Sequence, residues 1–168
     1  MSYALAYFIT WSTYGARLHG DPRGSVDQDH NLHGRPFVPE QLSRERFERD
    51  ELKHPPFVLS PAAREVVART IHDHAEHREW TVHALNARST HVHVVVQAPR
   101  GVEPETMMGQ FKASGSRRLR ERGLIGEGAR VWTPHGSTKH LVEAEGLMST
   151  VHYVADLQDH PGRFGGDR

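Results

Sequence analysis

Two histidines separated by a single residue are the clearest candidates for chemistry in this sequence. His91-Val92-His93 is followed directly by three more valines. Alternate side chains of a strand share a face, so both histidines would face the same way with their Cα atoms about 6.6–6.8 Å apart. Two imidazoles at that separation can bind one ion at metal–nitrogen distances of ~2 Å. The spacing therefore indicates a metal or phosphate site, and two strand histidines without a ligand are the alternative.

Two rival histidine motifs fit this segment less well. A histidine-triad nucleotide hydrolase needs a third histidine two residues further on, where Val95 stands. A two-histidine phosphoesterase needs Ser or Thr two residues after each of two separate histidines, but position 93 is itself a histidine. Neither motif explains the pair.

A tyrosine near the C-terminal end of the sequence is the second candidate. Tyr153 lies in the segment STVHYVADLQ, and a phenol can attack a phosphodiester when a metal ion polarises the phosphate. A residue one helical turn further on could complete the metal shell. Asp156 stands three residues beyond Tyr153 and Gln158 five beyond, while the position four residues on is Leu157. Taken alone, a helical tyrosine is more often a core or interface residue.

A basic stretch is the third candidate. Seven basic residues and two acidic ones lie between Met107 and Leu141, and Trp132 lies among them. Basic side chains beside an aromatic ring are typical of a groove that follows a single-stranded nucleic acid backbone. A solvated helix face would give the same pattern, so the sequence leaves both interpretations open.

The surrounding elements alternate in a way that predicts the fold. Ser60 followed by Pro61 is a typical helix start, and apolar residues at helical spacing predict a helix over 61–79. The other elements are expected as strands at 3–11, 80–86 and 90–98, helices at 103–122 and 143–158, and a broken strand or hairpin at 130–142. The order β-α-β-β-α-β-α predicts an α+β fold, a ferredoxin-like split βαβ antiparallel sheet with an added C-terminal helix that carries Tyr153.

Length and composition limit the function classes. A chain of 168 residues with 36% hydrophobic and 25% charged residues predicts one folded domain over 1–168. Residues 15–56 are rich in Gly and Pro and predict a long irregular excursion with one helical turn at 40–50. The absence of cysteine excludes disulfides, thiolate zinc sites and cysteine nucleophiles. No secretion signal or membrane-spanning run is present, so we expect a cytoplasmic protein with no membrane partner.

Four segments together resemble a known family. They are FITWSTYGARLHGDPRGSVD (8–27), STHVHVVVQAP (89–99), FKASGSRRLRERGL (111–124), and the stretch from VWTPHGSTKHL to VHYVADLQ (131–158). In this order the chain resembles the HUH single-tyrosine transposases of the IS200-like group, and within them the REP-associated tyrosine transposases and their relatives.

The resemblance implies a site and a reaction. His91 and His93 would bind Mg²⁺ or Mn²⁺, and Tyr153 would attack a single-stranded DNA phosphodiester to give a 5′-phosphotyrosine and a free 3′-OH. The family usually has a polar third ligand one turn beyond the tyrosine, where this chain has Leu157. The third ligand would then be Gln158, Asp156 or water, and the resemblance of the segment YVADLQ to the family favours Gln158.

The resemblance also implies a partner. Family members act on DNA hairpins with single-stranded flanks, and the expected DNA-binding residues here are Lys112, Arg117, Arg118, Trp132 and Tyr14, of which Tyr14 could equally be structural. The leading hypothesis is a metal-dependent single-stranded DNA endonuclease and strand transferase, acting as a monomer or homodimer. A domesticated protein that binds a DNA or RNA hairpin without cutting it is the alternative. A purely structural domain is the third possibility.

Overall fold

The computed structural model describes residues 3–16 and 56–157. The elements there are β1 (Ala6–Thr13), α2 (Pro61–His77), β2 (Thr81–Ala87), β3 (His91–Gln97), α3 (Pro104–Glu121), β4 (Trp132–Leu141), α4 (Ala144–His152) and a π-helical turn, η1 (Tyr153–Leu157). The expected order of elements is confirmed. The excursion and its helical turn at 40–50 fall almost wholly outside the described residues.

The four strands form one antiparallel sheet in the order β2-β3-β1-β4. The strand that carries the histidine pair and the first strand of the chain are therefore central, and β2 and β4 are the edges. In the register, Thr10 of β1 lies opposite His93 of β3, and His93 lies opposite Asn86 of β2. This is the split βαβ arrangement that the sequence predicted.

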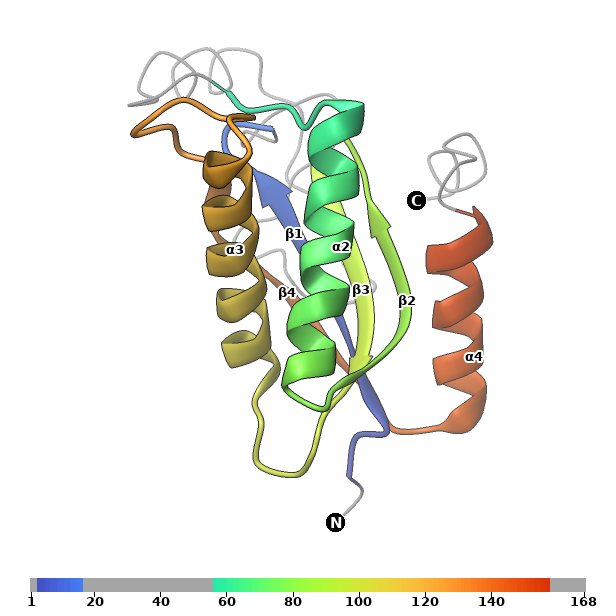
Figure 1. Cartoon of the computed structure of the whole chain (residues 1–168). Helices are drawn as coiled ribbons and strands as arrows, with labels where there is room; N and C mark the ends of the chain where they lie inside the picture. Colours follow the sequence, from blue (N-terminus) through green and yellow to red (C-terminus); the bar gives the residue numbers. More distant parts are fainter. Residues whose placement is uncertain (1–2, 17–55, 158–168) are drawn as a thin grey trace.

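Helices α2 and α3 lie side by side over one face of the sheet (Figure 1). Ser60 caps α2, because its hydroxyl oxygen accepts a hydrogen bond from the Ala63 N–H at 3.1 Å, and Pro61 occupies the first turn. The main core forms between these helices and the sheet. Its fully buried members include Ile9, Trp11, Val67, Ile71, Val92, Val94, Val96, Met107, Phe111 and Leu119. The prediction that Val92, Val94 and Val96 pack against helices is confirmed.

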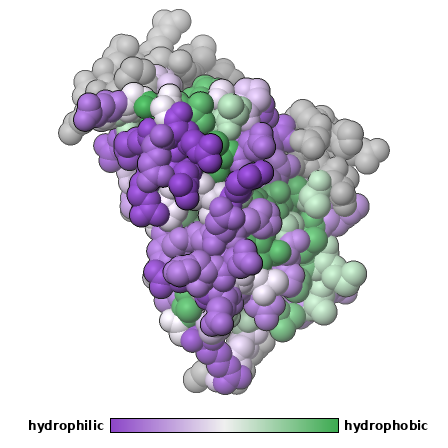
Figure 2. Space-filling view, in the orientation of Figure 1, coloured by the Kyte–Doolittle hydropathy of each residue, from purple (hydrophilic) through white to green (hydrophobic). Residues whose placement is uncertain are grey.

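The opposite face of the sheet carries a much smaller apolar cluster. Its buried members are Ala6, Ala84, Val95, Leu141 and Val154, and side chains of α4 and η1 pack against them. Helix α4 stands apart from α2 and α3, beyond β2 in Figure 1, and none of its own residues is buried. Apolar residues gather on that side in the space-filling view (Figure 2), whereas the surface over α2 and α3 is mostly polar.

Two expected boundaries were wrong, and a third element differs in part from what was expected. β1 begins at Ala6, not Tyr3, and runs on to Thr13, because β4 pairs with it from Ala6 to Thr13 and β3 pairs with it from Tyr7 to Ser12. Residues 132–141 form one strand, and not a hairpin, but the register against β1 shifts between the Trp11–Gly136 and Thr13–Trp132 partners, so the expected break is present as an irregularity around Pro134. An edge strand and a bulge both tolerate the missing N–H of a proline. The last helix ends at His152 and passes into the π-helical turn, which a search for 3.6-residue periodicity does not detect.

No helix in the ranges 3–16 and 56–157 is both long and apolar enough to span a bilayer.

Candidate active site

The histidine pair lies on the face of the sheet that α2 and α3 leave open. Val92, Val94 and Val96 point to the main core, so His91 and His93 point the other way together with Val95, as strand alternation requires. Their ring centroids are 4.6 Å apart and the ring planes are almost perpendicular. His93 is buried at 9% exposure, and His91 is half-buried. The predicted pairing on one face is thus present.

The pair fits a metal ion in geometry and chemistry. Two imidazoles that share an ion at ~2 Å per metal–nitrogen bond have centroids roughly 4.5–5 Å apart, which matches the observed 4.6 Å. Each ring also has a hydroxyl at Nδ1: Thr10 Oγ1 lies 2.9 Å from His93, and Thr90 Oγ1 lies 3.2 Å from His91. Metal-ligating histidines are held in this way at the nitrogen that does not ligate.

Other ligands are not assembled around the pair in the described part of the chain. No group of three His, Cys, Asp or Glu side chains that could hold an ion occurs within residues 3–16 and 56–157. Asp156 belongs to η1, but its side chain is not among those described, and Gln158 lies outside the described residues.

Tyr153, 60 positions further along the chain, packs beside the histidine pair. Its ring centroid is 6.3 Å from that of His93 and 6.4 Å from that of Phe8, edge to face in both cases. Phe8 in turn stacks on His93 at 5.7 Å with an interplanar angle of 15°. The structure therefore brings together a phenol and two imidazoles on one face of the sheet.

The π-helical turn is anchored where it presents Tyr153. The Val154 side chain is fully buried among Ala84 and Val95, and the Asn86 side-chain amide donates a long hydrogen bond of 3.4 Å to the Val154 carbonyl. Asn86 was missed by sequence reasoning. The role of Asn86 becomes visible only from the strand register, which places it opposite His93. That register could not be derived from the sequence.

Comparison with known proteins matches the sequence of this chain to a family. A profile of the family described as "Transposase IS200 like" matches residues 53–153, and so ends on Tyr153. The chain belongs to the IS200-like transposase family. No curated protein sequence matches it closely enough to count as a relative.

Solved structures support the fold of this IS200-like chain. A candidate transposase from Deinococcus radiodurans is 15% identical with a TM-score of 0.52, and the match covers 89% of this chain and 88% of that one. A REP-associated tyrosine transposase bound to a REP hairpin is 11% identical with a TM-score of 0.50, and the match covers 90% of this chain. The match takes in only 65% of the length of that second protein.

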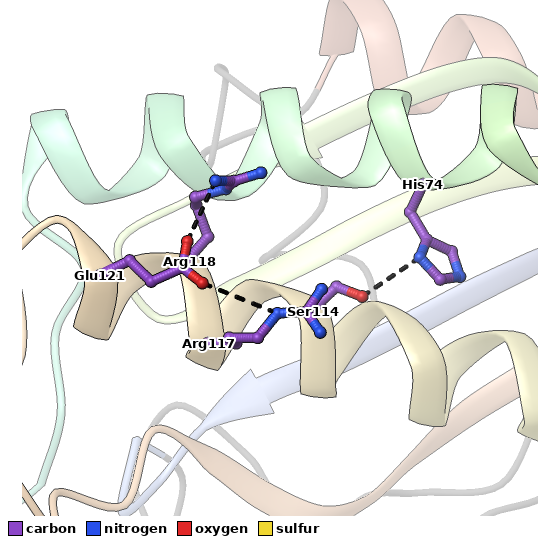
Figure 3. Close-up of polar contacts among 5 residues, drawn as sticks. All are labelled: His74, Ser114, Arg117, Arg118 and Glu121. Atoms are coloured by element: carbon purple, nitrogen blue, oxygen red, sulfur yellow. Dashed lines mark hydrogen bonds and ion pairs between the residues drawn. The ribbon is translucent and has the colours of Figure 1, made fainter.

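Three of the residues expected to bind DNA, Lys112, Arg117 and Arg118, belong to α3, which covers the face of the sheet opposite Tyr153. Arg117 and Arg118 are exposed on α3 and both contact Glu121, at 4.0 Å and 3.0 Å respectively (Figure 3). In the same view His74 of α2 reaches Ser114 of α3, which links the two helices. The two arginines therefore belong to the polar surface over α2 and α3, on the opposite side of the sheet from the histidine pair.

Lys112 joins α3 to the edge strand. Its ammonium donates to the carbonyls of Thr133 and His135 at 2.9 Å and 3.1 Å, and burial lowers the pKa of the Lys112 side chain to about 8. Lys112 thus holds the first residues of β4 against α3. Any contact with DNA would be a second role for this side chain, in addition to the structural one.

Trp132 and Tyr14 are both buried, at 8% exposure. The indole N–H of Trp132 donates to the Lys112 carbonyl at 2.9 Å, and its ring meets Trp11 edge to face. Arg130 lies over the Tyr14 ring at 5.5 Å. In this arrangement Trp132 packs in the core, and it would have to leave the core to stack on a base.

Proposed function

We propose that the protein is a metal-dependent single-stranded DNA endonuclease and strand transferase that acts on hairpin-flanked DNA. The observation that carries the proposal is the packing of Tyr153 against His93, on the face that also holds His91. Membership of the IS200-like transposase family supports DNA strand cleavage and rejoining as the reaction class.

Tyr153 supplies the nucleophile in this proposal. Its phenol oxygen gives up its proton to solvent and attacks the phosphorus of the scissile phosphodiester. The bond from phosphorus to the 3′ oxygen breaks, and that oxygen takes a proton and leaves as a free 3′-OH. The phosphate stays on the 5′ side as a 5′-phosphotyrosine. Attack of a 3′-OH on this intermediate restores a phosphodiester and the phenol, which rejoins strands.

His91 and His93 would hold Mg²⁺ or Mn²⁺ through their Nε2 atoms. When bound, the ion supplies positive charge that stabilises the phosphate as it is attacked. Imidazole with water and phosphate oxygens is a donor set that suits Mn²⁺ better than Mg²⁺, which prefers oxygen ligands throughout.

The π-helical turn affects which residue could be the third protein ligand of the proposed metal ion. A π turn closes hydrogen bonds from residue i to i+5, not i+4. Each turn therefore takes up more residues than an α-helical turn, and a continued π turn would bring position 158, a glutamine, nearer to the Tyr153 face than α-helical geometry would. This favours Gln158 over Asp156, which keeps Gln158 the predicted third ligand.

Hairpin DNA with single-stranded flanks is the proposed substrate. One structural neighbour is a REP-associated transposase bound to a REP hairpin, and the exposed Arg117 and Arg118 offer charges for a phosphate backbone. The protein would act on it as a monomer or homodimer.

The test is a search for a covalent adduct. The protein is incubated with a pool of single-stranded hairpin DNAs that carry random flanks, with Mn²⁺ or Mg²⁺, and resolved under denaturing conditions. We expect a protein–DNA adduct that disappears with a chelator, with Tyr153→Phe and with His91→Ala. Sequencing of the trapped strand then gives the cleavage site.

Two outcomes would redirect the proposal. Retention of hairpin DNA without any adduct would favour the non-cleaving DNA or RNA hairpin binder. An adduct that survives in Tyr153→Phe would move the nucleophile to another residue, and Tyr14→Phe would be examined next.

A further inference from the structure

A threonine hydroxyl accompanies each histidine of the pair. Thr10 Oγ1 lies 2.9 Å from His93 Nδ1, and Thr90 Oγ1 lies 3.2 Å from His91 Nδ1. Thr10 belongs to β1 and sits directly opposite His93 in the sheet register, whereas Thr90 immediately precedes His91 at the start of β3. The same atom of both rings is therefore held by the same type of group.

We propose that Thr10 and Thr90 are positioning residues that hold both imidazoles in the Nδ1–H form and so direct both Nε2 atoms to one ion. The hydrogen bond at one ring nitrogen decides which nitrogen is left to bind a metal. In this arrangement each threonine oxygen accepts the Nδ1–H of its histidine. The inference rests on the proposed function, because it assigns these residues to the proposed metal site.

Packing around His93 explains why a hydroxyl is needed there. Phe8 stacks on the ring at 15° and Tyr153 meets it edge to face, so neighbouring rings fix the plane of the imidazole. They do not fix which way round the ring sits in that plane, because a half-turn about the outer side-chain bond fills nearly the same space. A polar partner on one side removes this ambiguity, and Thr10 occupies that side.

Thr90 is hydrogen-bonded to the end of β1, and these bonds fix its backbone position. Its carbonyl accepts the Thr13 N–H at 2.8 Å and the Thr13 hydroxyl at 3.3 Å. Both threonines are thus fixed relative to the central strand, one within it and one bonded to it. At 3.2 Å the Thr90 contact is longer than the Thr10 contact, so we expect the larger effect from Thr10.

The test uses substitutions that keep shape and remove the hydroxyl. Thr10→Val is compared with Thr10→Ser, which keeps the hydroxyl, and with Thr138→Val as the matched control. Thr138 lies in the same sheet on the opposite face, where its hydroxyl donates to Glu105. Thr90→Val provides a second variant should Thr10→Val fail to fold.

Two measurements that do not involve activity are made on each protein. The first is the affinity for Mn²⁺ alone, followed by electron paramagnetic resonance. The second is the tautomer of each imidazole in the metal-free protein at a pH where it is neutral, from its ¹⁵N chemical shifts. We expect Thr10→Val to weaken Mn²⁺ binding by about 10–100-fold and to shift His93 toward the Nε2–H tautomer. Thr10→Ser and Thr138→Val should stay close to the wild-type protein.

The outcomes separate this inference from the proposed function. Wild-type Mn²⁺ affinity and unchanged ¹⁵N shifts in both valine variants would overturn the positioning role and leave the metal site standing. If the wild-type protein binds no Mn²⁺, the metal-dependent function fails. The ¹⁵N shifts still decide the inference in that case: an Nε2–H tautomer in the wild-type rings overturns it, and an Nδ1–H tautomer lost in Thr10→Val supports it.

Discussion

The two faces of the sheet differ in what their side chains do. The face under α2 and α3 is filled by large, fully buried apolar residues, among them Trp11, Phe111 and Ile71. The opposite face has a few small aliphatic residues in its cluster, with the histidine pair and Tyr153 beside it. No residue of α4, the helix that leads to Tyr153, is buried.

The difference suggests that stability and chemistry are assigned to separate faces of one sheet. Apolar burial of this kind is worth about 25 cal/mol per Å², so most of the stabilisation comes from the side with the larger core. A face that contributes little apolar burial can carry half-exposed polar side chains without a large loss of folding stability. Substitutions on the face that carries the histidine pair and Tyr153 should therefore affect activity with little change in stability. Substitutions on the face under α2 and α3 should lower stability with little direct effect on activity.

The largest expected effect is on activity, at Tyr153. Phenylalanine keeps the ring contacts with Phe8 and His93 and removes only the nucleophilic oxygen. We expect Tyr153→Phe to lose at least about 10³-fold in adduct formation, in keeping with the removal of a covalent nucleophile. Urea unfolding should give a free energy within about 0.5 kcal/mol of wild type. A drop of several kcal/mol would contradict the separation of the faces.

The next effect is on stability, at Phe111. This residue is 1% exposed and packs against Trp11, His74 and Trp80, so Phe111→Ala should lower the free energy of unfolding by about 3–5 kcal/mol. The matched change on the other side is Met148→Ala in α4, where the side chain is 72% exposed and the cost should be within about 0.5 kcal/mol. Equal losses in urea unfolding would show that α4 contributes as much core as α3.

Two glycines allow a smaller and more specific test. A Cβ on Gly136 would lie 2.5 Å from the Thr10 carbonyl oxygen and would also collide with Met108, so Gly136→Ala should cost about 1–3 kcal/mol. A Cβ on Gly109 in α3 would meet nothing within 4 Å, so Gly109→Ala should stabilise by about 0.5–1 kcal/mol through helix propensity. The thermal unfolding temperature should fall in Gly136→Ala and rise in Gly109→Ala. A shift of both temperatures in the same direction would refute the close approach of β4 to α3.

The smallest effect concerns pH and Lys112. Because burial lowers the pKa of folded Lys112 to about 8, the unfolded chain holds a proton between pH ~8 and ~10.5 that the folded chain has released. The contribution of this group to stability therefore rises with pH in that window and is flat below it. The side chain is half-exposed, so the gain should not exceed about 1 kcal/mol.

The measurement is urea unfolding of the wild-type protein and Lys112→Met at several pH values across that window. The difference in unfolding free energy should move in favour of the wild-type protein as pH rises. Lys139→Met, at an exposed position of the edge strand, controls for the loss of a lysine. A difference that stays constant, or moves the other way, would mean that Lys112 is not desolvated.

The sequence predicted the strands and helices well where local signals were strong. Alternation around His91 and His93, the capped start at Ser60 and the helical spacing of Val67 and Ile71 all depend on near neighbours, and each is confirmed. The approach of Tyr153 to His93 could be anticipated only through the family resemblance, because nothing local connects positions 60 residues apart.

Long-range register could not be read from the sequence. Thr10 and Asn86 flank His93 because the sheet register places them there, and neither residue belongs to a motif of its own. Trp132 and Lys112 illustrate the reverse case, because local composition indicated a nucleic-acid surface while tertiary packing placed Trp132 in the core and directed Lys112 to two carbonyls. Local composition reports residue type, not orientation.

The central position of β1 also bears on how the chain folds during synthesis. Tyr7 pairs with Val96 and Ala6 pairs with Leu141, so β1 leaves the ribosome before either of the strands that pair with it. At about 5–20 residues per second, the ~120 residues that separate β1 from β4 take on the order of ten seconds to appear. During that interval Phe8, Ile9 and Trp11 lack their native cover, while the β2–β3 hairpin can form locally. A chaperone that shields a nascent apolar strand would therefore matter most while β1 lacks its partner strands.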